Sequence, residues 1–494
     1  MKKKSGGRYA KRKVIQGFGY TFAALMVFLL TAFVDPAPAA DLWTVYGQAV
    51  ETSPLLKQSN ALLAADRASH KVARSALMPR LTARADIYRD HTHITGFGED
   101  FSSPSPSPTP TPSAAVFGDI TDTYTGGGYS VTLAQSLVNG QAWAGLRLAD
   151  ARVRAGEASV KAAEQDLILE VTEAYFGVLN ARADEHVALG QKALLKEILD
   201  RARADLAVGA GDIISLKEAR ASFDTAESQC VAAQNAVEIA RQQLRRLTHQ
   251  PPMALQDVGP IMARGPIPDQ VSPWILTAKE NQPLLEQARA EQKAAADGVD
   301  IARRTRWPDL SLTAGYAYSK GNFLPSVETE DTRIGLVCNL PLYEGGRISA
   351  QIARARAQKA ASQYRLNELS DRIELNTRNA FLTLKNSVSR FNAAKQALES
   401  AKTSLEATRK GYQIGSRTII DLLTAAQAYA QIQRDYYRTL YNHVLARVRL
   451  KWATGVVDET DVRAINELLC PSPGDRPEEQ KSIPEPNPLN KETD

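Results

Sequence analysis

The fold is decided by a short stretch between two long helical segments, Gly411-Tyr412-Gln413-Ile414-Gly415-Ser416-Arg417-Thr418-Ile419-Ile420-Asp421-Leu422-Leu423. Its glycines stop one helix, and Thr418 followed three residues later by Asp421 is the pattern that caps the start of the next. About 206 residues earlier, the same place in a similar segment is taken by Val208-Gly209-Ala210-Gly211-Asp212-Ile213-Ile214-Ser215-Leu216. The sequence therefore predicts an internal duplication with one hairpin tip per copy, at about 208–216 and about 411–423.

Prolines support the duplication. A helical stretch from Leu42 to about Leu77 ends at Met78-Pro79, and a similar stretch ends at Trp307-Pro308, because proline cannot continue the helical hydrogen-bond ladder. Within these stretches, Ser53-Pro54-Leu55-Leu56 matches Gln282-Pro283-Leu284-Leu285. Such a shared register over a whole helix predicts two structural repeats, 41–250 and 273–469.

After each closing proline the hydrophobic pattern changes to strict alternation, which indicates β-strands. The first copy contains alternating runs at about 81–95 and 124–137, and the second at about 310–320 and 332–342. Each run of roughly ten residues has the length of a tilted strand that crosses a bilayer in a barrel.

Beyond the strands, each copy enters a very long helix, at about 140–208 and about 347–414. Apolar residues recur every seven positions in both, which predicts coiled-coil packing: Leu146, Val153, Val160 and Leu167, then Leu384, Phe391, Leu398, Leu405 and Tyr412. A helix of about half that length returns after each tip, at about 212–248 and about 418–454. We expect each long helix to be flanked by two short helices stacked in line.

Residues 1–40 have the pattern of a cleavable secretory signal peptide: a basic start, an apolar run around Phe22 to Leu30, and small residues before Asp41. This segment holds seven Lys and Arg and one acid, so the remainder has 53 basic and 54 acidic residues. The nearly neutral remainder gives no reason to expect a nucleic-acid partner. A membrane anchor is the weaker interpretation because the apolar run is short.

Two further segments lie outside the repeats, and a third is inserted within the first repeat. The proline-rich stretch 251–272 is predicted to be a linker, and the polar tail 470–494 to be disordered. The Pro/Ser-rich run 102–112 is expected to be a solvated loop between the first two strands.

No catalytic or cofactor site is expected. His91 and His93 lack a third metal ligand, and Cys230, Cys338 and Cys470 lack metal-binding spacing. Carboxylates of the helices alternate with Lys and Arg, as on solvated helix faces. The sequence thus predicts neither an enzyme nor a bound cofactor.

Four strands with one apolar face cannot close a barrel, because small bacterial barrels need about eight or more strands. Open strand edges are not tolerated in lipid. The pattern therefore favours an oligomer that pools its strands into a closed ring with a lumen. The overall prediction is a mainly α protein with membrane β-structure, built on long coiled-coil hairpins.

The sequence resembles the TolC family of outer-membrane efflux and secretion channels over about 41–469. Beside the stretch at 411–423, the resemblance rests on Leu340-Pro341-Leu342-Tyr343-Glu344-Gly345-Gly346 and Ala174-Tyr175-Phe176-Gly177-Val178-Leu179-Asn180-Ala181. It implies a homotrimer with a 12-stranded barrel in outer-membrane lipid, continued by a periplasmic α-helical tunnel. It also implies a tripartite efflux pump or type I secretion system, in which the tips dock a periplasmic adaptor and an inner-membrane transporter supplies substrate.

The same resemblance implies a gate at the tips, with Tyr412, Arg417 and Asp421 at the pore constriction. The tip residues that would dock the adaptor are Gly209, Gly211, Asp212, Gly415 and Thr418. The sequence departs from the family pattern at Thr424, where a second ring aspartate is expected, and at Ile214 and Ser215, where the first copy would offer Thr and Asp. Two alternatives are left open for Arg417: it is solvated with no carboxylate opposite it, or it pairs with Asp212 or Asp421.

Structural alternatives stand beside these roles. Asp421 fits a capping box with Thr418, Tyr412 lies on the heptad and fits packing, and Gly209 and Gly415 fit plain helix stops. At the level of function, the alternative is a periplasmic coiled-coil adaptor or scaffold, which would share the hairpins but lack strands of membrane-spanning length.

Overall fold

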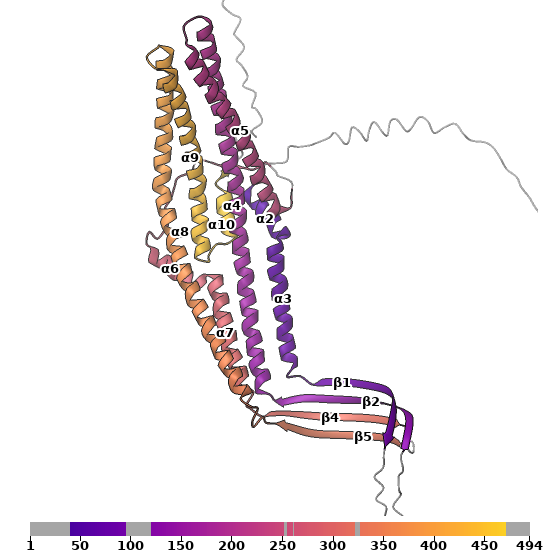
Figure 1. Ribbon diagram of the computed structural model, residues 1–494. Helices are drawn as coiled ribbons and strands as arrows, with labels where there is room; N and C mark the ends of the chain where they lie inside the picture. The colour runs from indigo at the N-terminus through magenta and orange to yellow at the C-terminus, as the bar shows by residue number, and fades with distance from the viewer. Residues whose placement is uncertain (1–39, 95–119, 251–253, 260, 322–326, 471–494) are drawn as a thin grey trace, which may run out of the picture.

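The computed structural model describes residues 40–94, 120–250, 254–259, 261–321 and 327–470. Long helices run side by side along most of the molecule, and a sheet extends from one end of them (Figure 1). The sheet has four strands. The predicted loop at 102–112 lies outside the described residues, as do the predicted signal peptide 1–40 and the predicted tail 470–494 except for Ala40 and Cys470.

The duplication is visible as two runs of six elements in the same order. The first repeat contains α2 (Leu42–Thr52), α3 (Pro54–Ser75), β1 (Arg80–Ile94), β2 (Ile120–Val138), α4 (Gly140–Ala207) and α5 (Ile213–Thr248). The second contains α6 (Val271–Asn281), α7 (Pro283–Arg304), β4 (Asp309–Gly321), β5 (Val327–Asn339), α8 (Arg347–Gln413) and α9 (Ile419–Ala453). The long and returning helices begin and end within one residue of the predicted positions.

The single helix expected before the strands is wrong in both copies, where two helices meet at a break. Pro54 and Pro283 each occupy the first turn of a new helix, since a proline there loses no intrahelical hydrogen bond but cannot continue a helix from before. At the first break, the Ser53 hydroxyl accepts a hydrogen bond from the Leu56 N–H at 3.3 Å. The two prolines thus mark helix starts as well as the shared register.

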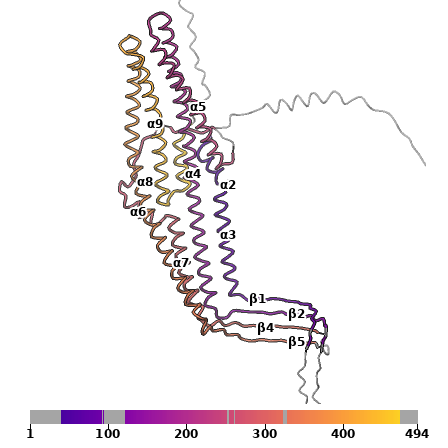
Figure 2. The backbone as a smooth tube through the Cα atoms, in the orientation of Figure 1, coloured from indigo at the N-terminus to yellow at the C-terminus, as the bar shows by residue number. Residues whose placement is uncertain are grey.

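The predicted stacking of short helices on a long one is confirmed. Helix α4, with 68 residues and a length on the order of 100 Å, packs against α3 over one half and α5 over the other. Helix α8 packs in the same way against α7 and α9. The tube in Figure 2 shows both sets, with the two tips at the end opposite the sheet.

The strand order is β1-β2-β4-β5, and every neighbouring pair is antiparallel. One row across the four strands is apolar: Leu81, Leu133, Ala314 and Ile334. The next row points to the opposite face and is polar or small: Thr82, Thr132, Gly315 and Arg333. Leu81 and Ile334 are 69% and 75% exposed, so the apolar face is uncovered in the single chain.

Strand β1 matches the expected 81–95 within one residue, whereas the other three strands are longer than their expected bounds. The four strands have 15, 19, 13 and 13 residues, and β5 covers Val327–Asn339 rather than 332–342. The early part of β5 contains Glu328 and Glu330, whose side chains obscure the apolar alternation. Pairing with the well-marked strand β4 fixes its place in the sheet.

Three elements near the middle of the helices were not predicted: β3 (Asp257–Val258), α10 (Glu459–Asn466) and β6 (Leu469–Cys470). Strand β3 pairs with β6, so the predicted linker 251–272 contains a strand. The linker also ends before the predicted residue 272, because α6 begins at Val271. Cys470, assigned to the tail, belongs to β6. A large apolar core joins these elements to α2, α4 and α9.

Among the described residues, the structure contains no helix that is both long and apolar enough to span a membrane.

Candidate gate and docking site at the helical tips

The two tips have the same backbone geometry. Gly209 and Gly415 both adopt φ of 75°, a left-handed conformation that glycine reaches without strain. Each donates its N–H to the carbonyl three residues back, and the next two N–H groups both point to one carbonyl, that of Asp205 in the first tip and of Gly411 in the second. The interpretation of both glycines as helix stops is confirmed.

In each tip, a residue before the turn lies close to a residue after it, and one residue of each pair is glycine. In the first tip a Cβ on Gly211 would lie 3.2 Å from the Cβ of Asp205. In the second tip the roles are exchanged: Arg417 stands at the place of Gly211, and a Cβ on Gly411 would lie 2.7 Å from the Arg417 Cγ. The close approach explains Gly211, which does not adopt a positive φ.

Helix α9 begins with the predicted capping box. The Thr418 hydroxyl accepts from the Asp421 N–H at 3.2 Å, and the Asp421 carboxylate accepts from the N–H and hydroxyl of Thr418 at 3.0 and 2.9 Å. These hydrogen bonds from Thr418 lower the pKa of Asp421, and Arg417 adds a smaller attraction. Asp421 therefore stays ionised at the start of α9.

Asp212 caps α5 in the same manner. Its carboxylate accepts hydrogen bonds from the N–H groups of Ile214 and Ser215 at 2.7 and 2.9 Å and from the Ser215 hydroxyl at 2.6 Å. These bonds, led by the one from the hydroxyl, lower the pKa of Asp212. The cap occupies this carboxylate, and no hydrogen bond or ion pair joins it to Arg417.

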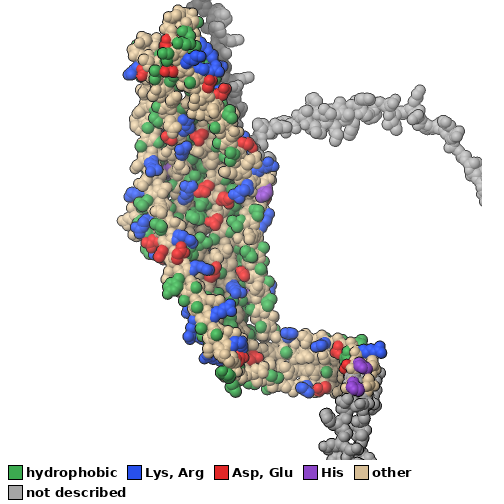
Figure 3. All heavy atoms as spheres, in the orientation of Figure 1, with side chains coloured by type: hydrophobic (Ala, Val, Ile, Leu, Met, Phe, Trp, Pro, Cys, Tyr) green, Lys and Arg blue, Asp and Glu red, His purple; other side chains and the backbone are tan. Residues whose placement is uncertain are grey.

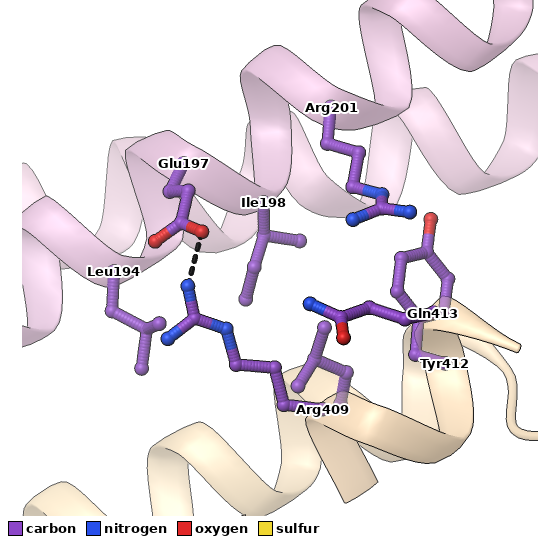
Figure 4. Close-up of a pocket in the computed structure, with 8 residues that line it drawn as sticks. Leu194, Glu197, Ile198, Arg201, Arg409, Tyr412 and Gln413 are labelled. Carbon is purple, nitrogen blue, oxygen red and sulfur yellow. Dashed lines mark hydrogen bonds and ion pairs between the residues drawn. The ribbon is translucent and has the colours of Figure 1, made fainter. Parts of the chain in front are cut away.

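Tyr412 links the two hairpins (Figure 4). Its hydroxyl donates to the Asp205 carboxylate of α4 at 3.4 Å, and the Arg201 guanidinium lies 5.6 Å from the centre of its ring. Burial and the Asp205 charge raise the pKa of Tyr412. Tyr412 thus packs between the hairpins, as the heptad predicts, and also makes a polar contact between the repeats.

Asp205 is a partner of Tyr412 that was not predicted from the sequence. It lies before the turn of the first tip and not at Ile214 or Ser215, where the family pattern offers Thr and Asp. Asp205 itself is held by Arg201, whose Nε lies 4.0 Å from it.

A second contact between the hairpins is an ion pair of Arg409 on α8 with Glu197 on α4. Both side chains lie on the same small pocket as Tyr412 and Arg201 (Figure 4). The contacts of Glu197 and Asp205 were not predicted from the sequence, because acids that alternate with arginines along α4 are typical of a solvated helix face. The one available signal was the heptad position of Tyr412, which predicts a contact with a neighbouring helix.

Arg417 has no carboxylate within 4 Å among the described residues of the chain. Its side chain is exposed and covers Gly411. Neither Asp212 nor Asp421 forms an ion pair with it, so the pairing left open by the sequence is not made within one chain.

Equivalent aliphatic side chains are exposed on both tips. Val208 and Ile414 are 79% and 80% exposed, and Ile214 and Ile420 are also exposed. Between the tips, a groove is lined by these last two residues and by carboxylates of the first repeat, Asp205, Asp212 and Glu218. The space-filling view shows apolar and charged side chains interspersed at this end of the molecule (Figure 3).

The histidines and cysteines noted in the sequence lie away from the tips. The Nδ1 atoms of His91 and His93 on β1 lie 2.8 and 2.5 Å from the hydroxyl oxygens of Thr123 and Thr121. In the described ranges, no three His, Cys, Asp or Glu side chains gather as a metal site would require.

Comparison with known proteins finds the family described as "Outer membrane efflux protein", whose profile matches residues 45–249 and 274–456. Outer membrane protein TolC of Escherichia coli K12 is 29% identical over 91% of this chain and 89% of its own. Alkaline protease secretion protein AprF of Pseudomonas aeruginosa is 26% identical over 90% and 91%. Among solved structures, the CmeC outer membrane channel of Campylobacter jejuni superimposes with a TM-score of 0.73 at 19% identity, covering 86% of this chain and 89% of its own.

Proposed function

The chain belongs to the family of outer membrane efflux proteins, and we propose that three copies of it assemble into one duct gated at the helical tips. The protein is an outer-membrane exit channel with a periplasmic tunnel and is not an enzyme. Family membership decides against the alternative of a periplasmic adaptor. The proposal concerns how the channel assembles, closes and receives its cargo.

The sheet carries the proposal. Strands β1 and β5 each have one unpaired edge within the described sheet, and unpaired strand edges are not tolerated in lipid. Only one face of the sheet is apolar and exposed, so only that face is suited to contact lipid. The helices that adjoin the strands along the chain pack in the order α3-α4-α7-α8, which is the order of the strands to which they connect. Joining the β1 edge of one copy to the β5 edge of the next therefore also joins α3 to α8.

Exposed apolar side chains on these two edge helices support that joining. Helix α8 exposes Tyr364, Leu375 and Leu382, and α3 exposes Leu55, Leu62 and Val72. Apolar residues repeated along a helix surface are typical of a helix that packs against another. Three four-stranded sheets give twelve strands, above the minimum for a closed barrel.

The gate is assigned to the contacts between hairpins at the tips. Opening the tunnel requires the α8–α9 hairpin to move away from the α4–α5 hairpin, which breaks the contacts of Tyr412 with Asp205 and of Arg409 with Glu197. Arg417, which forms no ion pair among the described residues of its own chain, faces a neighbouring copy when the tips converge. Three Asp421 carboxylates at that constriction attract cations.

The partners are assigned to the same end. The exposed aliphatic residues Val208 and Ile414, beside Gly209 and Gly415, form the surface on which a periplasmic adaptor docks, and the adaptor connects the duct to an inner-membrane transporter. Gly211, Asp212 and Thr418 shape this surface by setting the turns. The name of the relative AprF refers to protease secretion, so both efflux and type I secretion remain within the proposal. Crosslinking the protein in cells and identifying the transporter that copurifies with it distinguishes these two systems.

The test is extraction followed by conductance. The mature protein is expressed in a Gram-negative host, and membranes are washed with high salt and then with detergent. The proposal predicts release by detergent only, and ion conduction by the purified protein in planar bilayers. Release by salt alone would contradict it, as would purified protein that folds but never conducts.

A further inference from the structure

The face of the sheet that the proposed ring turns to lipid becomes polar toward the end away from the helices. Ala85, Tyr129, Tyr318 and Glu330 form one row across the four strands on this face. The ring centres of Tyr129 and Tyr318 lie 5.3 Å apart, and aromatic rows are typical of the boundary of a barrel's apolar band. Glu330 is exposed and has no hydrogen bond or ion pair among the described residues. A carboxylate at this boundary is costly unless a positive charge compensates it.

Two histidines lie beyond this row on the same face of β1. His91 and His93 are two residues apart, so both side chains leave the strand on the side of Leu81. Each lies directly opposite a threonine of β2, Thr123 or Thr121, whose hydroxyl oxygen is 2.8 or 2.5 Å from its Nδ1 atom. When Nδ1 carries the proton, it donates to that hydroxyl and leaves Nε2 free. Metal-binding histidines of proteins are commonly oriented by such a hydrogen bond.

The next copy in the proposed ring supplies the third ligand that the described part of one chain lacks. In a closed barrel every strand tilts the same way, so strand ends are displaced in one direction around the ring. One chain already shows this displacement, because Arg80, the first residue of β1, lies in the row of Thr313, which comes four residues after the start of β4. The same displacement between β5 of one copy and β1 of the next places His93 opposite Glu330. A displacement half as large places His91 there.

In either register the Glu330 carboxylate reaches both imidazoles. Side chains directly opposite each other on neighbouring antiparallel strands have Cβ atoms about 4.5–5.5 Å apart, and diagonal neighbours are about 7–8 Å apart, within the reach of long side chains. One histidine is then the direct neighbour of Glu330 and the other is its diagonal neighbour. The junction between two copies therefore gathers two imidazole nitrogens and one carboxylate on one face of the barrel.

We propose that His91 and His93 of one copy and Glu330 of the next bind a divalent transition metal ion, one at each junction of the ring. Two imidazoles, one carboxylate and a water molecule complete the tetrahedral coordination that Zn²⁺ adopts. The metal compensates the charge of Glu330 at the boundary of the apolar band and links adjacent copies. This inference rests on the proposed trimeric ring, because the site is incomplete in a single chain.

The metal site is tested by calorimetric titration of the detergent-solubilised trimer with ZnCl₂, after treatment with EDTA and without a histidine tag. We expect one Zn²⁺ per chain at this site, and affinity at least about tenfold weaker in each of His91→Gln, His93→Gln and Glu330→Gln. His186→Gln, at an exposed position on α4, is the matched control and is expected to leave the affinity unchanged. An intact trimer that binds no zinc, or unchanged affinity in any of the first three variants, overturns the proposal.

The placement of the ligands on two copies is tested by disulfide crosslinking in membranes. Glu330→Cys is combined with His91→Cys or with His93→Cys, and at least one of the two double variants is expected to form disulfide-linked dimers and trimers on oxidation. The three single variants control for the native cysteines. Double variants that crosslink no more than the single variants overturn the proposed site. Trimers that conduct but bind no zinc would refute this inference alone, whereas a protein that forms no trimer would refute the proposed function as well.

Discussion

At the scale of single residues, the hydroxyl of Tyr412 is the smallest group to which the proposed gate gives a role. Tyr412→Phe removes the hydrogen bond to Asp205 but keeps the ring beside Arg201. A hydrogen bond to a charged partner contributes about 1.5–3 kcal/mol, and this one lies at the weak end because it is long. We expect a several-fold rise in the open fraction of single channels. Tyr343→Phe, at an 89% exposed position far from the tips, is the control. Equal open fractions in both variants would remove Tyr412 from the gate.

Asp421 combines a cap and a charge, and two variants separate them. Thr418→Ala removes the hydroxyl that caps α9 and keeps the Asp421 carboxylate, whereas Asp421→Ala keeps that hydroxyl and removes the carboxylate. We expect only Asp421→Ala to lower cation selectivity and block by multivalent cations in bilayer recordings. If Thr418→Ala lowers selectivity to the same degree, Asp421 acts through the cap alone.

The lowered pKa of Asp421 sets the pH range of this selectivity. A depressed carboxyl pKa means that the charge is present above the ordinary value, about 3.9, and is lost only as pH falls through the lower folded value. Cation selectivity is therefore expected to be unchanged from pH 7 to pH 4 and to decline below that. A decline that begins at pH 5 to 6 would show that another group controls it.

At the scale of elements, the two tips fold the same way because each contains a glycine at φ of 75°. Gly415→Ala places a side chain in a left-handed conformation and is expected to cost about 1 kcal/mol. Gly177→Ala is the control, since this exposed helical glycine has open space at its Cβ position and alanine favours the helix. Urea unfolding should show a lower midpoint for the first variant and no loss for the second. Equal midpoints would contradict the account of the turn.

The proposed docking surface involves both tips. Replacing Val208 and Ile414 together with Asp puts charges on the exposed aliphatic residues of both tips. We expect site-specific crosslinking to the adaptor to fall at least tenfold, with conductance retained. Met262→Asp, at an 82% exposed position on the linker, is the control. Unchanged crosslinking in the double variant would move the adaptor to another surface.

The long helices, the returning helices and the tips were predictable within a residue because a glycine or proline lies within three residues after each of these helices, in both repeats. The breaks at Pro54 and Pro283 were missed because a proline in a first turn leaves the helical pattern on both sides intact. Helix α10 and strands β3 and β6 are short, and long-range packing holds them in place. Asp205 could not be assigned because its role depends on Tyr412, 207 residues away.

At the scale of the whole molecule, one chain is an incomplete channel. Its sheet is open at β1 and β5, its apolar face is bare, and Arg417 has no carboxylate partner among the described residues. In the proposed ring of three chains, the edges pair, the apolar face turns to lipid, and the tips converge. The tunnel of that ring would continue the barrel, because each strand adjoins, along the chain, the helix at the same position in the order.

The most direct test of this assembly is native mass spectrometry of the detergent-solubilised protein after removal of bound lipid. The account predicts one dominant species with three times the mass of the mature chain. A folded protein found only as one or two chains would contradict the proposed trimeric duct, because it would contain only four or eight strands in place of twelve.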